Sequence, residues 1–125
     1  ARGMQRARPR DAIGYTLEGD VLMAQQRPAE AMTPYREALR RDGGAAAVIG
    51  LHRAALAAKR PADAEQALAD WQKRHPQDVV VPAYLADADL RRGDHGAAAK
   101  RYRAILERQP QNVVVLNNYA WALDR

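Results

Sequence analysis

The chain has 125 residues, 47% of them hydrophobic, a formal net charge of +5 and no cysteine. That length and apolar content suit one ordinary folded domain. The lack of cysteine excludes a disulfide scaffold, a thiol nucleophile and a thiolate metal site. No stretch approaches the ~20 apolar residues of a membrane span, and the first residues are too polar for a signal peptide.

The composition predicts an all-α fold. Phenylalanine is absent, and strand-forming runs are limited to residues 79–81 and 113–115. The sequence pI of about 10.0 reflects an excess of arginine. A basic chain can bind nucleic acid or an anionic lipid surface. Because the arginines are scattered over predicted helix faces, we favour a solvated surface instead.

The chain repeats itself at a spacing of 33 or 34 residues. Helix-breaking residues close each unit, and their separations are 34, 33 and 34: Pro9, Gly43, Pro76 and Pro110. Three more sets of equivalent positions, here called columns, keep this spacing: Ala31, Ala64 and Ala98; Tyr35, Leu68 and Tyr102; and Gly19, His52, Ala86 and Ala120. Four columns that agree indicate a repeat of helix–turn–helix units.

The repeat divides the chain into five segments. They are residues 1–11, the end of a preceding second helix that Pro9 closes; the first repeat, 12–44, with helices near 13–25 and 28–41; the second repeat, 45–78, with helices near 46–58 and 61–75; the third repeat, 79–112; and 113–125, the first helix of a further repeat or a capping helix. Since composition at both ends looks interrupted, we expect a piece of a longer protein.

A repeat of 34 residues with small residues in mid-helix and proline at the unit end resembles the tetratricopeptide repeat (TPR). The best-matching unit carries the family's pattern at Leu85, Ala86, Gly93, Asp94, Ala98, Tyr102 and Pro110. The resemblance implies a right-handed α–α superhelix of antiparallel helix pairs. It also implies a concave groove lined by the first helix of each unit.

Several residues carry local expectations. Pro28 suits a helix start, whereas Pro34 inside a predicted helix should kink or distort it. Asp78 and Asn112 are expected to cap the helices that follow them. Trp71 is expected in the core.

Asp89 shares a column with three apolar residues, Leu22, Ala55 and Leu123. A carboxylate in such a position is costly without a partner, which we expect to be Arg92 or Arg101.

Catalysis has little support in the sequence. The three histidines, His52, His75 and His95, lack metal-ligand spacing, serine is absent, and no glycine-rich phosphate loop exists. We therefore expect no enzyme activity, no cofactor, no metal and no small-molecule substrate.

The groove is the better candidate for function, because tyrosine, tryptophan and arginine anchor protein interfaces. The period places Leu17, Gly50 and Tyr84 in one groove-facing column with Asn118. The residues expected to contact a peptide or protein partner are Thr16, Asp20, Arg53, Tyr84, Asp87, Asn117, Asn118 and Trp121. Alternatively, Asp20, Arg53 and Asp87 pair only with one another and contribute little. The lysines and asparagines that co-chaperones of this family use to grip a terminal carboxylate are missing.

Three further expectations concern partners and location. A basic face on the second helices could bind nucleic acid, through Arg36, Arg40, Arg41, Arg101, Arg103 and Arg108. The apolar segment 113–123 suggests end-to-end self-association. The run Leu116–Ala122 resembles TPR lipoproteins of the bacterial exosortase/PEP-CTERM system. That resemblance implies a periplasmic or outer-membrane-anchored parent with a role in exopolysaccharide or surface-protein export; otherwise we expect a cytoplasmic protein.

Overall fold

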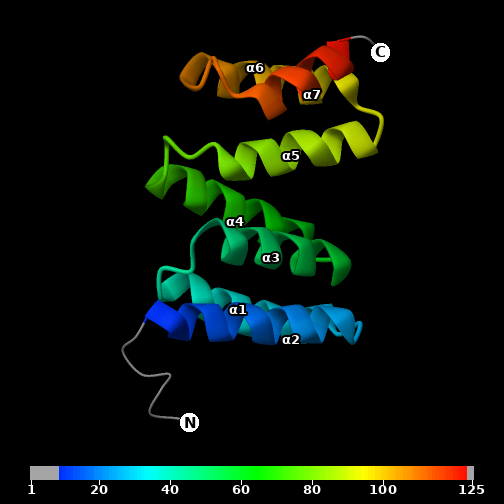
Figure 1. Ribbon diagram of the computed structural model, residues 1–125. Helices are drawn as coiled ribbons and strands as arrows, with labels where there is room; N and C mark the ends of the chain where they lie inside the picture. Colours follow the sequence, from blue (N-terminus) through cyan, green and yellow to red (C-terminus); the bar gives the residue numbers. More distant parts are fainter. Residues whose placement is uncertain (1–8, 124–125) are drawn as a thin grey trace. The chain divides into compact units, whose positions relative to one another are not determined.

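The computed structural model describes residues 9–123, and those residues form α-helices joined by short loops, with no strand (Figure 1). This confirms the predicted all-α fold. The helices are α1 (Pro9–Ala24), α2 (Pro28–Arg40), α3 (Gly44–Ala57), α4 (Pro61–Arg74), α5 (Val80–Arg91), α6 (His95–Arg108) and α7 (Val113–Leu123). Within this described range, no helix is long and apolar enough to cross a membrane.

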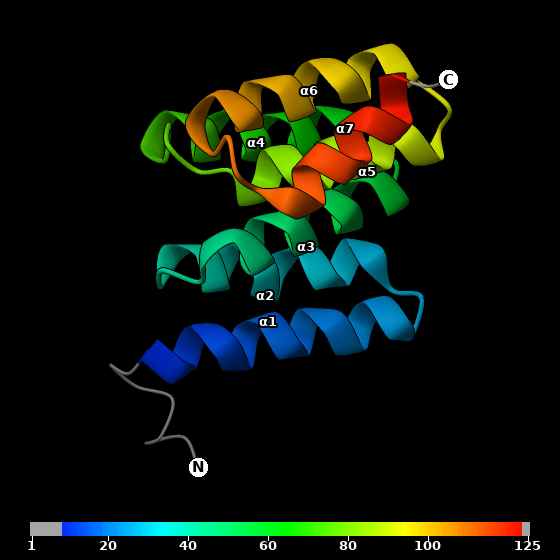
Figure 2. The same cartoon turned by 45° about the horizontal axis from the view of Figure 1, so that its top comes forward.

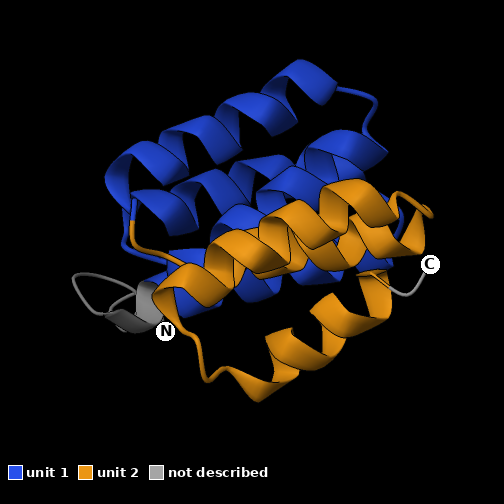
Figure 3. Ribbon diagram, turned by 90° about the horizontal axis from the view of Figure 1, so that it is seen from above, with its two compact units in different colours: residues 1–76 blue, residues 77–125 orange. Residues whose placement is uncertain are grey.

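The chain divides into two compact units, which Figure 3 shows in different colours. Unit 1 is Ala1–Pro76 and contains α1 to α4, whereas unit 2 is Gln77–Arg125 and contains α5 to α7. Within unit 1, α1 packs on α2, α2 on α3, and α3 on α4; within unit 2, α6 packs on both α5 and α7 (Figure 2). Each unit is thus built from helices that pack on their neighbours in sequence. The assignment of three repeat units and a further helix stays a prediction.

Prolines mark several helix starts. Pro28 and Pro61 open α2 and α4, where the missing N–H group costs no helical hydrogen bond. Pro9 plays the same role, because α1 begins there. Residues 9–11, which were expected at the end of a preceding helix, therefore belong to α1, and the rest of that expected helix, residues 1–8, lies outside the described range. Pro34 is buried inside α2, which continues past it to Arg40.

Side-chain caps form where the sequence predicted them. Both carboxylate oxygens of Asp78 accept backbone N–H groups, from Val80 at 3.1 Å and from Val81 at 2.9 Å. The Asn112 side chain accepts the N–H of Val115 at 3.1 Å. Each cap satisfies donors that the first turn of a helix leaves without a partner, and so fixes where α5 and α7 begin.

The turn between the first and second helix of each repeat has one backbone geometry. Gln26, Lys59 and Gly93, spaced one repeat apart, have φ angles of 61°, 63° and 85°. In each turn the next residue donates its N–H to a carbonyl five residues back, as Arg60 does to Ala55 at 2.8 Å. This is the Schellman arrangement, in which a left-handed residue ends the helix.

Each unit has its own buried core. In unit 1 the core is Ala31, Met32, Tyr35, Leu51, Ala54, Ala55 and Ala64; in unit 2 it is Ala86, Ala98, Tyr102, Ile105, Val115 and Ala122. Trp71 is buried, as expected. His52 is buried too, and burial lowers its pKa, opposed by the charge of Glu65. Its imidazole is therefore neutral near pH 7.

Candidate functional site

The first helices of unit 1 present a carboxylate held by a tyrosine. Tyr35 on α2 passes between α1 and α3, and its hydroxyl donates to Asp20 Oδ1 on α1 at 2.5 Å. The ring needs this space: a Cβ added to Gly19 or Gly50 would lie 2.6 or 2.4 Å from Tyr35 Cε1. Burial, then the hydrogen bond and the charge of Asp20, raise the pKa of Tyr35 above its ordinary 10.0. The phenol is therefore a permanent donor that orients the Asp20 carboxylate.

The same arrangement recurs in unit 2. Tyr102 on α6 donates its hydroxyl to Asp87 on α5, with the same separation of 15 residues along the chain. The side chain of Asn118 on α7 lies close to this hydroxyl and acts to lower its pKa. Burial is the largest of the effects that raise the pKa of Tyr102, followed by the bond to Asp87. Asn118 and Asp87 therefore meet at one buried phenol.

The middle repeat has no such pair. Leu68 stands in the tyrosine column, and Arg53 stands where Asp20 and Asp87 stand. Arg53 is exposed, and its charge opposes the rise in the pKa of Tyr35, so it lies near the tyrosine–aspartate pair of unit 1. Unit 1 thus presents a carboxylate and a guanidinium from neighbouring first helices.

The other predicted contact residues are placed as follows. The Thr16 hydroxyl donates a hydrogen bond to the carbonyl of Ala12 at 3.0 Å, so this donor is already satisfied within α1. Tyr84 is half-buried, and Asn117 is exposed. Trp121 is 50% exposed and stacks on His95, with ring centroids 5.9 Å apart. A half-exposed indole is available to a partner, whereas the Thr16 hydroxyl is less so.

One groove-facing assignment is wrong. Gly50 is buried, and its Cα lies against the Tyr35 ring rather than facing outward. The period placed Gly50 and Asn118 in one column, and both indeed meet a tyrosine. A glycine at this position leaves room for the Tyr35 ring, while the Asn118 side chain lies near the Tyr102 hydroxyl. Sequence reasoning missed both tyrosines as supports, although each stands 15 residues after its aspartate.

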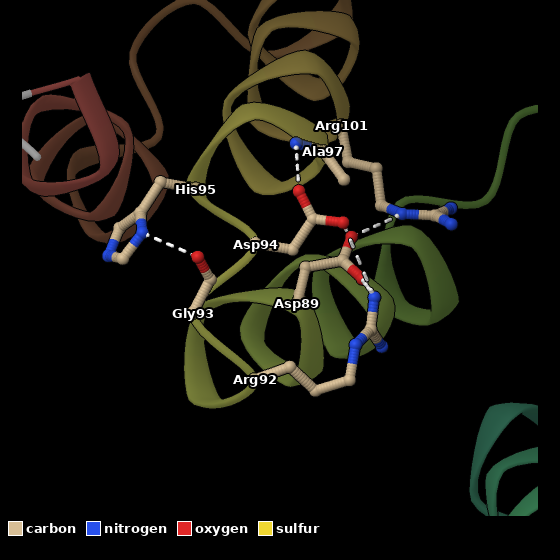
Figure 4. Close-up of polar contacts among 7 residues, drawn as sticks. All are labelled: Asp89, Arg92, Gly93, Asp94, His95, Ala97 and Arg101. Atoms are coloured by element: carbon tan, nitrogen blue, oxygen red, sulfur yellow. Dashed lines mark hydrogen bonds and ion pairs between the residues drawn. The ribbon is translucent and has the colours of Figure 1, made fainter.

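The buried Asp89 is the centre of an ion cluster, which Figure 4 shows. The residue is 3% exposed, and its two carboxylate oxygens accept from Arg92 at 2.7 Å and from Arg101 Nε at 2.9 Å. Asp94 stands at the start of α6 and accepts the N–H of Ala97. Both arginines named from the sequence are therefore confirmed as partners. The cluster joins α5 to α6, so its role is structural.

Ion pairs occupy much of the predicted basic face. Arg40 and Arg41 share Glu37, at 2.8 and 2.7 Å, and Arg101 is engaged by Asp89. Each pair places a carboxylate beside a guanidinium group, which lowers the net positive charge that this face offers to phosphate. In residues 9–123, no group of three or more histidine, aspartate or glutamate side chains could hold a metal ion.

Two family models match the chain, and both are described as tetratricopeptide repeat. The first covers residues 22–86 and the second covers residues 85–125. A comparison with curated proteins finds no match. The two matches together include α2 to α7 and most of the positions on which the sequence-based repeat rests.

Proposed function

We propose, from the premise that this chain belongs to the tetratricopeptide-repeat family, that it is a non-enzymatic scaffold that binds a peptide or protein segment. Repeats of this family generally mediate protein–protein interactions. The contacts are made by side chains of the first helices, α1, α3, α5 and α7. The residues of this chain that contact the partner are those named from the sequence, and Asp20, Arg53, Asp87 and Trp121 are the main anchors.

One observation carries this proposal: the aspartates at equivalent repeat positions are each held by a buried tyrosine. A carboxylate fixed before binding loses little conformational freedom when a partner arrives. Since Tyr35 occupies Oδ1 of Asp20, the other oxygen can accept a donor from the partner. Arg53 adds an exposed guanidinium nearby, and arginine is common among residues that dominate binding energy. We therefore expect a partner segment that carries both a cationic and an acidic side chain.

A capture experiment followed by calorimetry tests the proposal. The immobilised chain is used to capture a partner from bacterial envelope extract, and the captured protein is then purified and titrated against variants. Asp20→Asn, Arg53→Ala and Trp121→Ala should each weaken binding by about 1–3 kcal/mol while circular dichroism stays helical. Arg103→Ala is the control, because Arg103 is exposed on a second helix. The proposal fails if Arg103→Ala weakens binding as much as the three first-helix variants.

Binding to nucleic acid is the second candidate. Its support is the net charge of +5 and the arginines on second helices. A single-stranded and a double-stranded oligonucleotide, titrated at two salt concentrations, separate the two candidates. Steeply salt-dependent binding that survives the three first-helix substitutions would favour nucleic acid over a protein partner.

We also propose a cellular location and role for the parent protein, from the resemblance of Leu116–Ala122 to lipoproteins of the exosortase/PEP-CTERM system. In that setting the parent protein is periplasmic or anchored in the outer membrane and acts in polysaccharide or surface-protein export. Cell fractionation with an antibody against this segment tests it. Recovery of the parent protein in the cytoplasmic fraction would refute the setting and leave the scaffold function intact.

We also propose self-association through α7. The support is its exposed apolar residues: Val113, Val114, Leu116, Trp121 and Leu123. Burying such a surface against a second copy would be favourable. Sedimentation velocity over a range of concentrations should show a dimer that Val114→Lys abolishes. A chain that stays monomeric at about 100 µM would contradict self-association through α7.

A further inference from the structure

We infer that unit 1 carries a second site, which takes a small organic monocarboxylate with an apolar body. The site is a cavity of about 580 Å³ between α2, α4 and the start of α3. That volume is typical of pockets for small ligands. All of its lining residues belong to unit 1, and none of them is among the partner-binding residues on the first helices.

A departure from the repeat accompanies this cavity. The column that holds Ala38 in α2 and Ile105 in α6 holds Trp71 in α4. Trp71 lines the cavity and stacks on His75, with ring centroids 3.9 Å apart and planes at 29°. Trp71 is therefore much larger than its counterparts in α2 and α6, and it forms part of the cavity wall.

The floor of the cavity is apolar. It is formed by Leu39, Val48, Leu51, Ala67 and Trp71. Val48 and Leu51 are buried residues of α3, so this surface belongs to the rigid core and not to a loop. An apolar ligand body placed here would leave water, which favours binding.

The rim supplies cationic donors that are not fully used. Arg36 lies 3.9 Å from Asp63, its only ion pair within the described residues and too long for a hydrogen bond. Asp63 is bonded more closely to Arg60, at 2.8 Å. Arg74 also lines the cavity and forms no ion pair within residues 9–123. Two guanidinium groups can therefore turn to an anion without breaking a strong bond.

Acidic residues limit the charge of the ligand. Asp42, Asp63 and Asp70 also line the cavity, and Asp70 accepts from Gln66 at 2.9 Å. Three arginines and three aspartates cancel in formal charge, so a polyanion would meet repulsion that a single carboxylate avoids. Arginine binds a carboxylate with two parallel hydrogen bonds. A monocarboxylate is therefore the anion that this rim fits.

The probe for this site is 2-naphthoate, compared with 2-naphthalenemethanol, which has the same rings without the charge. Binding is followed in the variant Trp121→Phe, which leaves Trp71 as the only tryptophan, and is mapped by amide chemical shifts. We expect 2-naphthoate to shift amides of α2, α3 and α4 and to bind at least ~10-fold more tightly than the alcohol. Arg36→Gln and Arg74→Gln should each remove ~10-fold in affinity.

Arg103→Gln is the matched control, because Arg103 occupies the repeat position of Arg36 on α6, in unit 2. Its affinity for 2-naphthoate should equal that of the parent variant. The inference is overturned if acid and alcohol bind alike, if Arg36→Gln has no effect, or if the shifted amides lie in unit 2. Circular dichroism confirms that each variant is folded. None of the residues proposed to bind the protein partner lines the cavity. The outcome for 2-naphthoate is therefore independent of the scaffold function.

Discussion

A buried carboxylate is stable only when charged donors surround it, and Asp89 meets that condition through Arg92 and Arg101. Both arginines keep exposed surface, while the aspartate side chain is 4% exposed. The cost of burial therefore falls on the carboxylate. Removal of one arginine leaves that cost partly uncompensated, whereas removal of the carboxylate releases two groups that already contact water.

From this asymmetry we predict the outcome of a double-mutant cycle. Arg101→Ala should lower the free energy of unfolding by about 1–3 kcal/mol. Asp89→Leu copies Leu22 of the same column, and adding it to Arg101→Ala should recover most of that loss. Urea denaturation measures each variant, with Arg103→Ala expected within about 0.5 kcal/mol of the parent. Additive losses in the double variant would contradict this account.

Tyr35 and Tyr102 predict a loss of stability at alkaline pH. Their pKa values are raised in the folded chain, so they stay protonated where tyrosines of the unfolded chain, with an ordinary pKa of 10.0, ionise. Unfolding then releases protons, and stability falls as pH rises above about 10. Each tyrosine contributes up to about 1.4 kcal/mol per pH unit in that range.

Urea denaturation at a series of pH values from about 8 to 11 tests this expectation. The double variant Tyr35→Phe/Tyr102→Phe should be less stable than the parent at pH 8, since each phenol loses a hydrogen bond to an aspartate. Its stability should then fall less steeply above pH 10. Tyr15→Phe is the control, because Tyr15 lies under Arg41 and donates to no aspartate in residues 9–123. Equal slopes in parent and double variant would refute the assignment.

At the scale of the elements, the repeat is a backbone feature as well as a residue pattern. The three turns that follow α1, α3 and α5 share a left-handed residue, although only the last uses glycine. An L-residue in this conformation costs roughly 1–2 kcal/mol relative to glycine. Gln26 and Lys59 therefore hold strain that the surrounding hydrogen bonds impose.

We predict that Lys59→Gly stabilises unit 1 by about 0.5–1 kcal/mol. Relief of the left-handed strain exceeds the extra freedom that glycine gives the unfolded chain. Gly93→Ala, the reverse change at the equivalent turn of unit 2, should destabilise by a similar amount. Thermal denaturation followed by circular dichroism measures both. Changes of the same sign at the two turns would show that the backbone angle is not the cause.

The sequence predicted the helices because their apolar period and capping residues are local signals. Asp78 and Asn112 fixed two helix starts in this way. It did not predict the left-handed turns at Gln26 and Lys59, because neither residue type favours that conformation. The start of α1 was expected near residue 13 and lies at Pro9, because proline is compatible both with the end of one helix and with the start of the next.

The candidate site was only partly predictable for a related reason. Period alone placed Asp20 and Asp87 at equivalent positions, but a period cannot reveal which side chain touches them. The repeat period assigned Gly50 to the groove, whereas in fact the Tyr35 ring fills the space beside it. Contacts between helices decide such cases, and those depend on the volume of side chains far apart in sequence.

At the scale of the whole chain, the separation of the two cores matters for stability. Unit 1 buries an alanine-rich cluster around Met32 and Tyr35, and unit 2 buries another around Tyr102 and Ile105. In a repeat protein, stability is approximately a sum of contributions from repeats and their nearest neighbours. A substitution in one core should therefore act mainly on the helices that share that core.

Native-state hydrogen exchange tests this locality. Ile105→Ala removes a buried side chain of unit 2, and we expect amides of α5 to α7 to lose about 2–4 kcal/mol of protection. Amides of α1 to α4 should lose less than half as much. Met32→Ala in unit 1 should give the opposite pattern. Equal losses throughout the chain after either substitution would mean that it opens as a single cooperative unit, and the two cores would then not be energetically independent.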